Sequence, residues 1–122
     1  MNIQIKLLLV KGDNTSQEVG LICGDNRFSL PSHTHDGVSL KSTFEKLCIS
    51  LCDLGNWPYV TSLSSVLDDK EYVYIIYKTF IFNSPINQQI FKNVQWIKYE
   101  NLSTIRWLDK KDIRIIRETY NL

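Results

Sequence analysis

The chain has 122 residues, of which 43% are hydrophobic and 22% are charged, and it carries a formal net charge of +1. This length is enough to bury one hydrophobic core and too short for two ordinary domains, so we expect a single domain spanning residues 1–122. The near balance of 14 basic and 13 acidic residues gives no electrostatic reason to expect nucleic acid or a membrane as a partner.

The first part of the chain has the pattern of a three-stranded meander. Apolar and more polar residues alternate over positions 3–9, which is typical of a half-buried strand. Turns that contain glycine then separate two further predicted strands, at residues 18–23 and 27–30. The next segment, residues 32–36, is polar and predicts a surface loop.

A helix is predicted over residues 40–54, because apolar residues recur there at spacings of three and four. Ser39 precedes it and is the expected N-cap, since its hydroxyl can accept a hydrogen bond from a backbone N–H two or three residues later. The apolar residues that share one face are Leu40, Phe44, Leu47, Cys48 and Leu51. Of these, we expect Leu40, Phe44 and Cys48 to be buried against the sheet.

The second half of the chain predicts more strands. Residues 59–66 read as a strand of mixed polarity, and residues 72–82 are aromatic or β-branched nearly throughout. That composition predicts a central strand with both faces covered. Residues 83–93 are polar and predict a loop, and two shorter strands are predicted at residues 94–99 and 105–108.

A final helix is predicted to begin after Asp109, its expected N-cap. Asp112 adds an acidic residue to the first turn, where it would complement the helix dipole. Ile113, Ile116 and Tyr120 supply the expected buried face. The basic residues of the other side are expected to be solvated and not to read nucleic acid; they are Lys110, Lys111, Arg114 and Arg117.

The three cysteines, Cys23, Cys48 and Cys52, are odd in number, which favours reduced thiols over a disulfide framework. No stretch approaches the roughly 20 apolar residues of a membrane-spanning helix, and the N-terminus alternates instead of forming a signal sequence. We therefore expect a cytoplasmic protein.

Two metal sites are conceivable from residue types alone. Cys48 and Cys52 could join His33 and His35 around zinc, but Cys-x-x-Cys pairs are absent, and free cysteine often packs as a small apolar residue. We favour core packing for both cysteines. The second set, His33 and His35 with Asp36, is more simply explained as part of a polar surface loop.

Residues 28–53 combine the end of a strand, a short loop and a helix. The apolar edge closes in Leu30-Pro31, and Gly37-Val38-Ser39 opens the helix. This layout resembles the Nudix box. In that family a strand ends in Leu-Pro-Gly-Gly, a loop reaches Gly-Glu-Ser, and the helix carries Arg-Glu, an apolar residue, any residue, Glu-Glu, any residue and Gly.

The resemblance can be extended residue by residue from Ser39, the serine that opens the helix. It places Lys46 at the family's arginine and Leu47 at the next glutamate, while Ser50 and Leu51 stand at the glutamate pair. It therefore implies a box without its three metal-binding glutamates. Nudix hydrolysis needs hard divalent cations held by several oxygen ligands, which leucine cannot supply.

The order of the other predicted elements also resembles this family. One strand precedes the box, two follow it, and Trp107-Leu108-Asp109 opens the final helix as an aromatic turn commonly does there. The resemblance implies an α/β fold. It would be a Nudix-like α/β/α sandwich whose mixed sheet carries a box-type helix and a C-terminal helix.

For function, the resemblance implies a non-catalytic binding module that takes a nucleotide-derived ligand or a protein partner at the altered cleft. No catalytic residue, metal or cofactor is expected. The alternative is a Nudix-type hydrolase of nucleoside-diphosphate derivatives with unconventional metal ligands.

In the resembled family, the side chains at the positions of Leu47 and Leu51 face the metal cleft. We expect both leucines to be partly exposed here and to support a protein contact or self-association. The residues expected to bind the ligand or partner are Arg27, His33, His35, Lys46, Leu47 and Leu51. The side chains available to hold a base or phosphate are Trp57, Trp96, Tyr99, Arg27 and Arg106.

Overall fold

The computed structural model describes residues 2–12, 17–24, 27–35, 37, 39–52, 61–81, 91–105 and 108–120. The strands are β1 (Asn2–Gly12), β2 (Gln17–Gly24), β3 (Arg27–Ser29), β4 (Ser32–Thr34), β5 (Thr61–Asp68), β6 (Tyr72–Ile81) and β7 (Val94–Lys98). The helices are α1 (Leu40–Leu51), the 3-10 helix η1 (Tyr99–Thr104) and α3 (Lys110–Tyr120). None of the helices in these ranges is long and apolar enough to cross a membrane.

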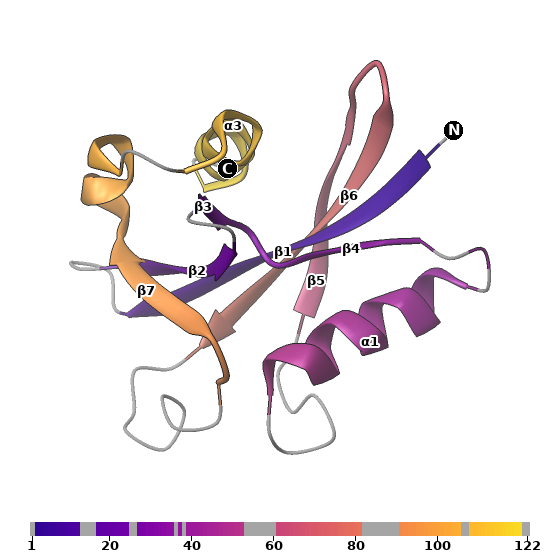
Figure 1. Cartoon of the computed structure of the whole chain (residues 1–122), viewed down its shortest axis with the longest axis horizontal. Helices are drawn as coiled ribbons and strands as arrows, with labels where there is room; N and C mark the ends of the chain where they lie inside the picture. The colour runs from indigo at the N-terminus through magenta and orange to yellow at the C-terminus, as the bar shows by residue number, and fades with distance from the viewer. Residues whose placement is uncertain are drawn as a thin grey trace.

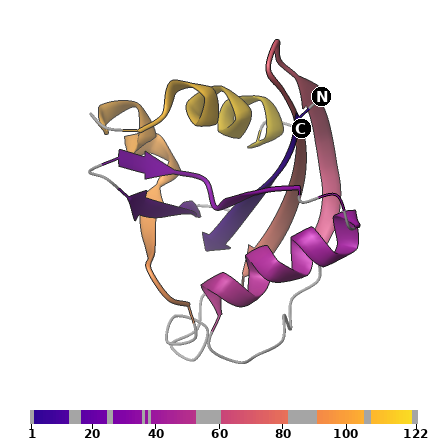
Figure 2. The same ribbon diagram turned by 45° about the vertical axis from the view of Figure 1, so that its right-hand side comes forward.

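The strands form one mixed sheet with β1 near its centre, and α1 and α3 lie on opposite faces of it (Figures 1 and 2). β1 runs parallel to β6 along one edge. Along its other edge, its first half pairs antiparallel with β4 and its second half with β2. β2 also pairs with β3 and β7, while β5 lies outside β6. The predicted meander of the first three strands and the interior position of β6 are therefore confirmed.

Both faces of β1 are covered, so the prediction of a half-buried strand is wrong. Its side chains alternate between two buried clusters. One cluster lies under α3 and includes Leu8, Val10, Tyr74, Ile76, Ile115 and Ile116. The other lies under α1 and includes Ile5, Leu7, Leu9, Leu47, Cys48, Leu51 and Ile81. A continuous apolar run suits a strand that is buried on both sides.

Residues 32–34 form β4, so the prediction that they belong to a surface loop is wrong. They gain their hydrogen bonds from β1, where Ile5 is paired with His33. Leu7 N also donates to Pro31 O at 2.9 Å, which continues the connection one residue earlier. A short polar strand of this kind is stabilised by its neighbour and has no pattern of its own.

Helix α1 begins where predicted. The Ser39 hydroxyl accepts a hydrogen bond from Ser42 N at 3.0 Å, which confirms the N-cap. The apolar face is rotated relative to the prediction, because Leu40 is 38% exposed and Phe44 is half-buried, while Cys48 is fully buried. The Phe44 ring packs against Tyr77, with 4.8 Å between the ring centroids. The helix ends at Leu51, and residues 53–54 lie outside the described residues.

The last part of the chain differs from the prediction in one element. η1 follows β7 directly, where the sequence showed no helical pattern. Of the predicted strand 105–108, Ile105 lies in no strand and Leu108 makes an isolated bridge to Phe28, while residues 106–107 lie outside the described residues. Most of the predicted loop 83–93 is likewise outside the described residues.

Helix α3 has the predicted start. Lys111 N donates to Asp109 Oδ1 at 2.8 Å, as expected for an N-cap. Ile116 is fully buried and Ile113 is half-buried, and the basic residues of the outer side are exposed as predicted. The side chain of Tyr120 lies outside the described part of the structure.

Candidate functional site

The residues expected to bind a ligand or partner lie on different elements. Arg27 is at the hairpin end of β3, paired with Gly24 of β2, whereas His33 belongs to β4, which pairs with β1. Lys46 lies on α1. All three of these basic side chains are exposed, so each can reach a partner, but they do not share one element.

Leu47 and Leu51 are 3% and 4% exposed, so the expectation that they are partly exposed is wrong. Both belong to the buried cluster under α1, together with Ile5, Leu7 and Leu9 of β1. The helix lies flat against this face of the sheet, which places its two leucines over the odd-numbered side chains of the strand. Two of the three positions that the resemblance aligns with metal-binding glutamates are therefore filled by core side chains, and the third, Ser50, is exposed.

His35 connects β4 to α1 through hydrogen bonds on both sides. Its Nδ1 lies 2.9 Å from Thr43 Oγ1, and the Thr43 hydroxyl donates to Ser39 O at 3.0 Å. Because a hydroxyl has only one proton to donate, His35 Nδ1 must be the donor to Thr43. His35 N also donates to Ile3 O at 2.8 Å, so the residue is held from both sides. Thr43 is fully buried, which makes this contact part of the helix anchor.

Cys48 and Cys52 are buried free thiols, which confirms the core-packing interpretation. Burial, followed by the charges of Cys52 and Glu45, raises the pKa of the Cys48 thiol to about 12. A thiol of this kind stays protonated near neutral pH and is a poor metal ligand or nucleophile. Within the described ranges, no group of three or more His, Cys, Asp and Glu side chains could hold a metal ion. Asp36 lies outside those ranges.

The polar surface of α1 offers little for metal chemistry. Glu45 is the one acidic residue between Leu40 and Leu51, and it is exposed. Ser50, at a position of the family's glutamate pair, donates its hydroxyl to Leu47 O at 2.6 Å. That hydroxyl is therefore engaged with the helix's own backbone.

The aromatic residues that could stack on a nucleotide base do not lie together. Trp96 packs beside the cluster under α1, whereas Tyr99 packs beside the cluster under α3. Trp57 and Arg106 lie outside the described residues. Of the aromatic residues proposed to hold a base, only Trp96 therefore has a described position on the α1 side.

Trp96 has a charged neighbour that the sequence analysis missed. Lys11 Nζ lies 4.5 Å from the centroid of its indole ring and 3.5 Å from Glu18 Oε2. Lys11 is only 5% exposed, and the Phe91 ring meets Trp96 edge-on. The available signal was the position of Lys11 directly after the apolar run of residues 7–10, since buried lysines are rare unless paired.

Comparison with known proteins addresses the fold. Neither a scan against models of protein families nor a search of curated proteins finds a match. Among solved structures, the Nudix domain of Shewanella oneidensis NrtR, complexed with ADP ribose, matches with a TM-score of 0.72 and 13% identity, over 98% of this chain and 86% of that chain. The C-terminal domain of mouse MUTYH, complexed with human PCNA, matches with a TM-score of 0.70 and 14% identity, over 99% and 88%.

A mutT/nudix family protein from Listeria innocua also matches, with a TM-score of 0.69 and 9% identity, over 98% of this chain and 92% of that chain. Identities this low show the fold alone. The chain therefore has a Nudix-like α/β fold with a mixed sheet and helices packed on it, as the resemblance of residues 28–53 implied.

Proposed function

We propose that this chain is a non-catalytic binding module of Nudix-like fold, and that its main partner is a protein. The observation that carries the proposal is the burial of Leu47 and Leu51, at 3% and 4% exposure, on the helix that corresponds to the box helix. Filling this surface with core side chains removes the oxygen ligands that divalent metal ions need there. Glu45, the remaining carboxylate of α1, is exposed and adjacent to Lys46.

A protein partner is favoured by exposed apolar side chains on β5, the edge strand beside β6. Leu63 and Val66 of β5 are 58% and 56% exposed. They are paired across the sheet with Tyr77 and Ile75, which pack beside the cluster under α1. Paired residues point to the same face, so these four side chains form one surface, the β5 patch. Contiguous apolar surface of this kind is typical of protein interaction sites.

Similarity of fold adds support, because the MUTYH domain was crystallised with a protein, human PCNA. Of the residues expected from the sequence, the exposed Arg27, His33 and Lys46 remain proposed contacts. His35, Leu47 and Leu51 support the surface indirectly by holding α1 on the sheet.

A nucleotide-derived ligand is the second candidate. It is favoured by the likeness to the NrtR domain that was crystallised with ADP ribose. Lys11 and Trp96 offer a cation and an indole ring on the same side of the sheet as α1. The first measurement is therefore calorimetric titration of the protein with ADP-ribose, with Lys11→Met as the matched variant.

The proposal is tested by activity and by binding. Purified protein should not turn over ADP-ribose, dinucleoside polyphosphates or nucleoside triphosphates with Mg²⁺ or Mn²⁺. A partner protein captured from cell extract by the wild type should then be purified. Its affinity should be measured by titration against the wild type, the Leu63→Asp/Val66→Asp variant and the control Ile49→Asp. Ile49 is 50% exposed on α1 and lies outside the β5 patch. Affinity should fall in the double variant alone, and metal-dependent turnover abolished by a chelator would establish the hydrolase alternative instead.

A further inference from the structure

Strand β5 forms one edge of the sheet, and its outer side pairs with none of the described strands. The strand order is β3-β2-β1-β6-β5, so β5 follows β6 at the end. In Figure 2 the β5–β6 hairpin forms the right-hand border of the molecule. Within the described ranges, no hydrogen bond joins residues 62–68 to a segment beyond this hairpin. The backbone N–H and C=O groups along the outer side can therefore pair with another strand.

β5 contains one extra residue relative to its neighbour. Leu63 is paired with Tyr77 of β6. The next pair is Ser65 with Ile76, so Ser64 is an extra residue that forms a β-bulge. A bulge changes which side chains of a strand lie on the same face of the sheet.

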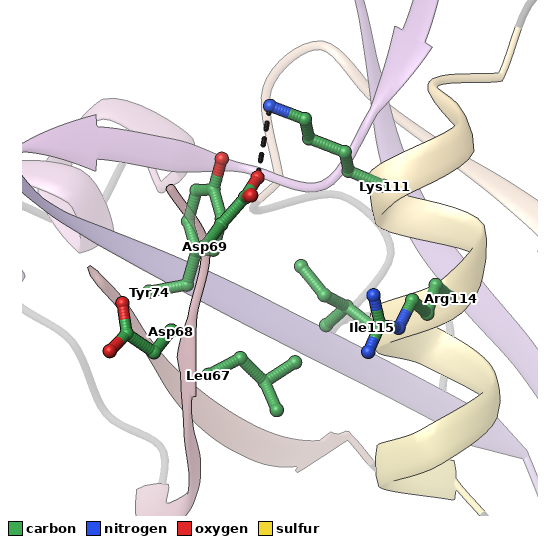
Figure 3. A pocket seen from close by; sticks show the side chains of 7 residues that line it. All are labelled: Leu67, Asp68, Asp69, Tyr74, Lys111, Arg114 and Ile115. Carbon is green, nitrogen blue, oxygen red and sulfur yellow. Dashed lines mark ion pairs between the residues drawn. The ribbon is translucent and has the colours of Figure 1, made fainter. Parts of the chain in front are cut away.

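The bulge determines which side chains of β5 lie on the α1 side. Before the bulge they are Thr61 and Leu63, and after it they are Val66 and Asp68, so their spacing is two, three and two residues. Figure 3 shows the alternation at the end of the strand, where Leu67 points toward α3 and the Asp68 carboxylate points away from it. The spacing is the same when the strand is followed from either end.

The two apolar side chains on the α1 side of β5 are open to solvent. Leu63 is 58% exposed and Val66 is 56% exposed, while α1 packs over β1 and β6. Edge strands of soluble proteins commonly carry a lysine or a proline that discourages further pairing. Residues 61–68 contain neither, and their one charged residue is Asp68. The composition of this edge therefore permits another strand to pair with it.

We propose that this edge pairs with β5 of a second copy of the chain, as two antiparallel strands related by a two-fold axis. The proposal rests on the proposed function, since it names the protein that occupies the β5 patch. The pairing places Leu63 of one copy opposite Val66 of the other, and Thr61 of one copy opposite Asp68 of the other. Each pair occurs twice, as two-fold symmetry requires.

The bulge favours a second copy over an unrelated strand. In a regular strand, side chains on one face are two residues apart throughout, so a regular partner falls out of phase with β5 on one side of Ser64. A second copy carries the same extra residue, and its reversed spacing of two, three and two matches that of β5. The two Asp68 carboxylates then lie at opposite ends of the paired strands, roughly 20 Å apart, and do not repel each other.

The hairpin that presents this edge is held in place on the α3 side. Lys111 Nζ lies 3.3 Å from Asp69 Oδ2, as the dashed line in Figure 3 marks, and this ion pair joins the turn after β5 to α3. Leu67 packs against the cluster under α3, which includes Tyr74 of β6. The strand is thus ordered before association, which lowers the entropic cost of pairing.

The area available predicts a weak dimer. The eight residues of β5, at about 3.3 Å each, give a paired edge of about 26 Å. Such an edge buries roughly 400–500 Å² per copy, which is less in total than the roughly 1,200–2,000 Å² of stable interfaces. We therefore expect a dissociation constant on the order of 10–100 μM.

The test is analytical ultracentrifugation of the intact chain from about 5 μM to about 1 mM. The wild type should shift from the monomer mass to twice that mass as the concentration rises. Leu63→Lys/Val66→Lys should weaken the dimer at least about tenfold, because lysines of the two copies would face each other. The matched control Ile49→Lys changes a residue that is 50% exposed on α1, and it should dimerise as the wild type does.

A mixing experiment tests the pairing of Leu63 with Val66. Leu63→Glu/Val66→Glu should also be monomeric by itself, since carboxylates would then face carboxylates. An equimolar mixture of the glutamate and lysine variants should form a mixed dimer, because each lysine would meet a glutamate of the other copy. Circular dichroism and thermal midpoints confirm that each variant is folded.

Three results would overturn the proposal. These are a wild type that stays monomeric up to about 1 mM, a lysine variant that dimerises as the wild type does, and a mixture that does not associate. The proposed function is judged separately. A monomeric wild type that still binds a foreign protein through the β5 patch would refute the second copy and leave the binding module intact. Metal-dependent hydrolysis by a dimeric protein would refute the binding module and leave this interface intact.

Discussion

Lys6 Nζ lies 2.7 Å from Asp112 Oδ1, and this ion pair joins the central strand β1 to the first turn of α3. The two side chains are only 8% and 1% exposed. The second carboxylate oxygen of Asp112 accepts a hydrogen bond from Leu30 N at 2.9 Å, so one carboxyl group connects three segments that are distant in the sequence. Its role is to anchor α3 on the sheet as well as to complement the helix dipole.

The first prediction concerns this ion pair. Replacing one partner leaves the other charge buried without compensation, which costs about 3–5 kcal/mol. Lys6→Met should therefore lower the free energy of unfolding by that amount in urea titrations. The double variant Lys6→Met/Asp112→Leu should recover much of the loss, because two apolar side chains need no partner. Single variants that unfold at the wild-type urea concentration would contradict the anchoring role.

The second prediction concerns pH. Burial raises the pKa of the Asp112 carboxyl above its ordinary range, although the charge of Lys6 and hydrogen bonds from Lys6 and Leu30 oppose this. The folded state therefore holds the proton more tightly than the unfolded state does. Stability from this group is fully present below its unfolded pKa and is lost as the pH rises through the folded pKa.

Measuring the urea midpoint from acid to neutral pH tests this sign. Lys6→Met removes a charge that favours the ionised carboxyl, so its stability should fall more steeply with rising pH than that of the wild type. Asp112→Asn cannot titrate at this position and serves as the control. Parallel curves for wild type and Lys6→Met would show that the carboxyl is not coupled to Lys6.

The fold was predictable where local pattern decides structure. The spacing of apolar residues along α1 and the polar side chain of Ser39 are local signals, and both the helix and its N-cap are confirmed. The composition of β6 similarly indicated an interior strand. β4 was missed because Ser32, His33 and Thr34 have no apolar alternation, and only the backbone of β1 makes them a strand.

The candidate site was less predictable, because it depends on contacts between distant segments. The resemblance correctly indicated the fold, but the exposure of Leu47 and Leu51 depends on how closely α1 lies on β1. Asp112 was predicted only to complement the helix dipole, because of its position in the first turn. Its ion-pair partner, Lys6, is 106 residues away in the sequence. The ion pair between Lys111 Nζ and Asp69 Oδ2, 3.3 Å apart, likewise requires the turn after β5 and helix α3 to meet.

The third prediction separates a buried helix face from an exposed one. Leu47→Glu/Leu51→Glu should unfold the protein, because both carboxylates would be buried in an apolar cluster. The single change Leu47→Ala should cost about 2–5 kcal/mol of unfolding free energy. Ile49→Glu is the matched control on the same helix and should be tolerated, since Ile49 is 50% exposed. A folded double variant would restore the interpretation of these leucines as an open partner surface.

The fourth prediction uses the cysteines to report on the same helix. Cys23 is exposed, whereas Cys48 and Cys52 are buried. Iodoacetamide should therefore modify Cys23 in the native protein and reach the other two only after unfolding in urea. The thiolate is the reactive form, and burial, reinforced by Cys52 and Glu45, raises the pKa of Cys48 from 9.0 to about 12. Mild alkaline conditions should not make Cys48 reactive as long as the chain stays folded.

Mass spectrometry of the labelled peptides gives the readout, and Cys23→Ser should remain unlabelled in its native state. The shift in pKa also has a sign for stability. The stability that protonated Cys48 contributes is present below the ordinary thiol pKa of 9.0 and is lost as the pH rises toward 12. The free energy of unfolding should therefore fall less over this pH range in Cys48→Ala than in the wild type. Rapid native labelling of Cys48 would mean that α1 leaves the sheet readily, and the filled surface that supports a non-catalytic module would then be open part of the time.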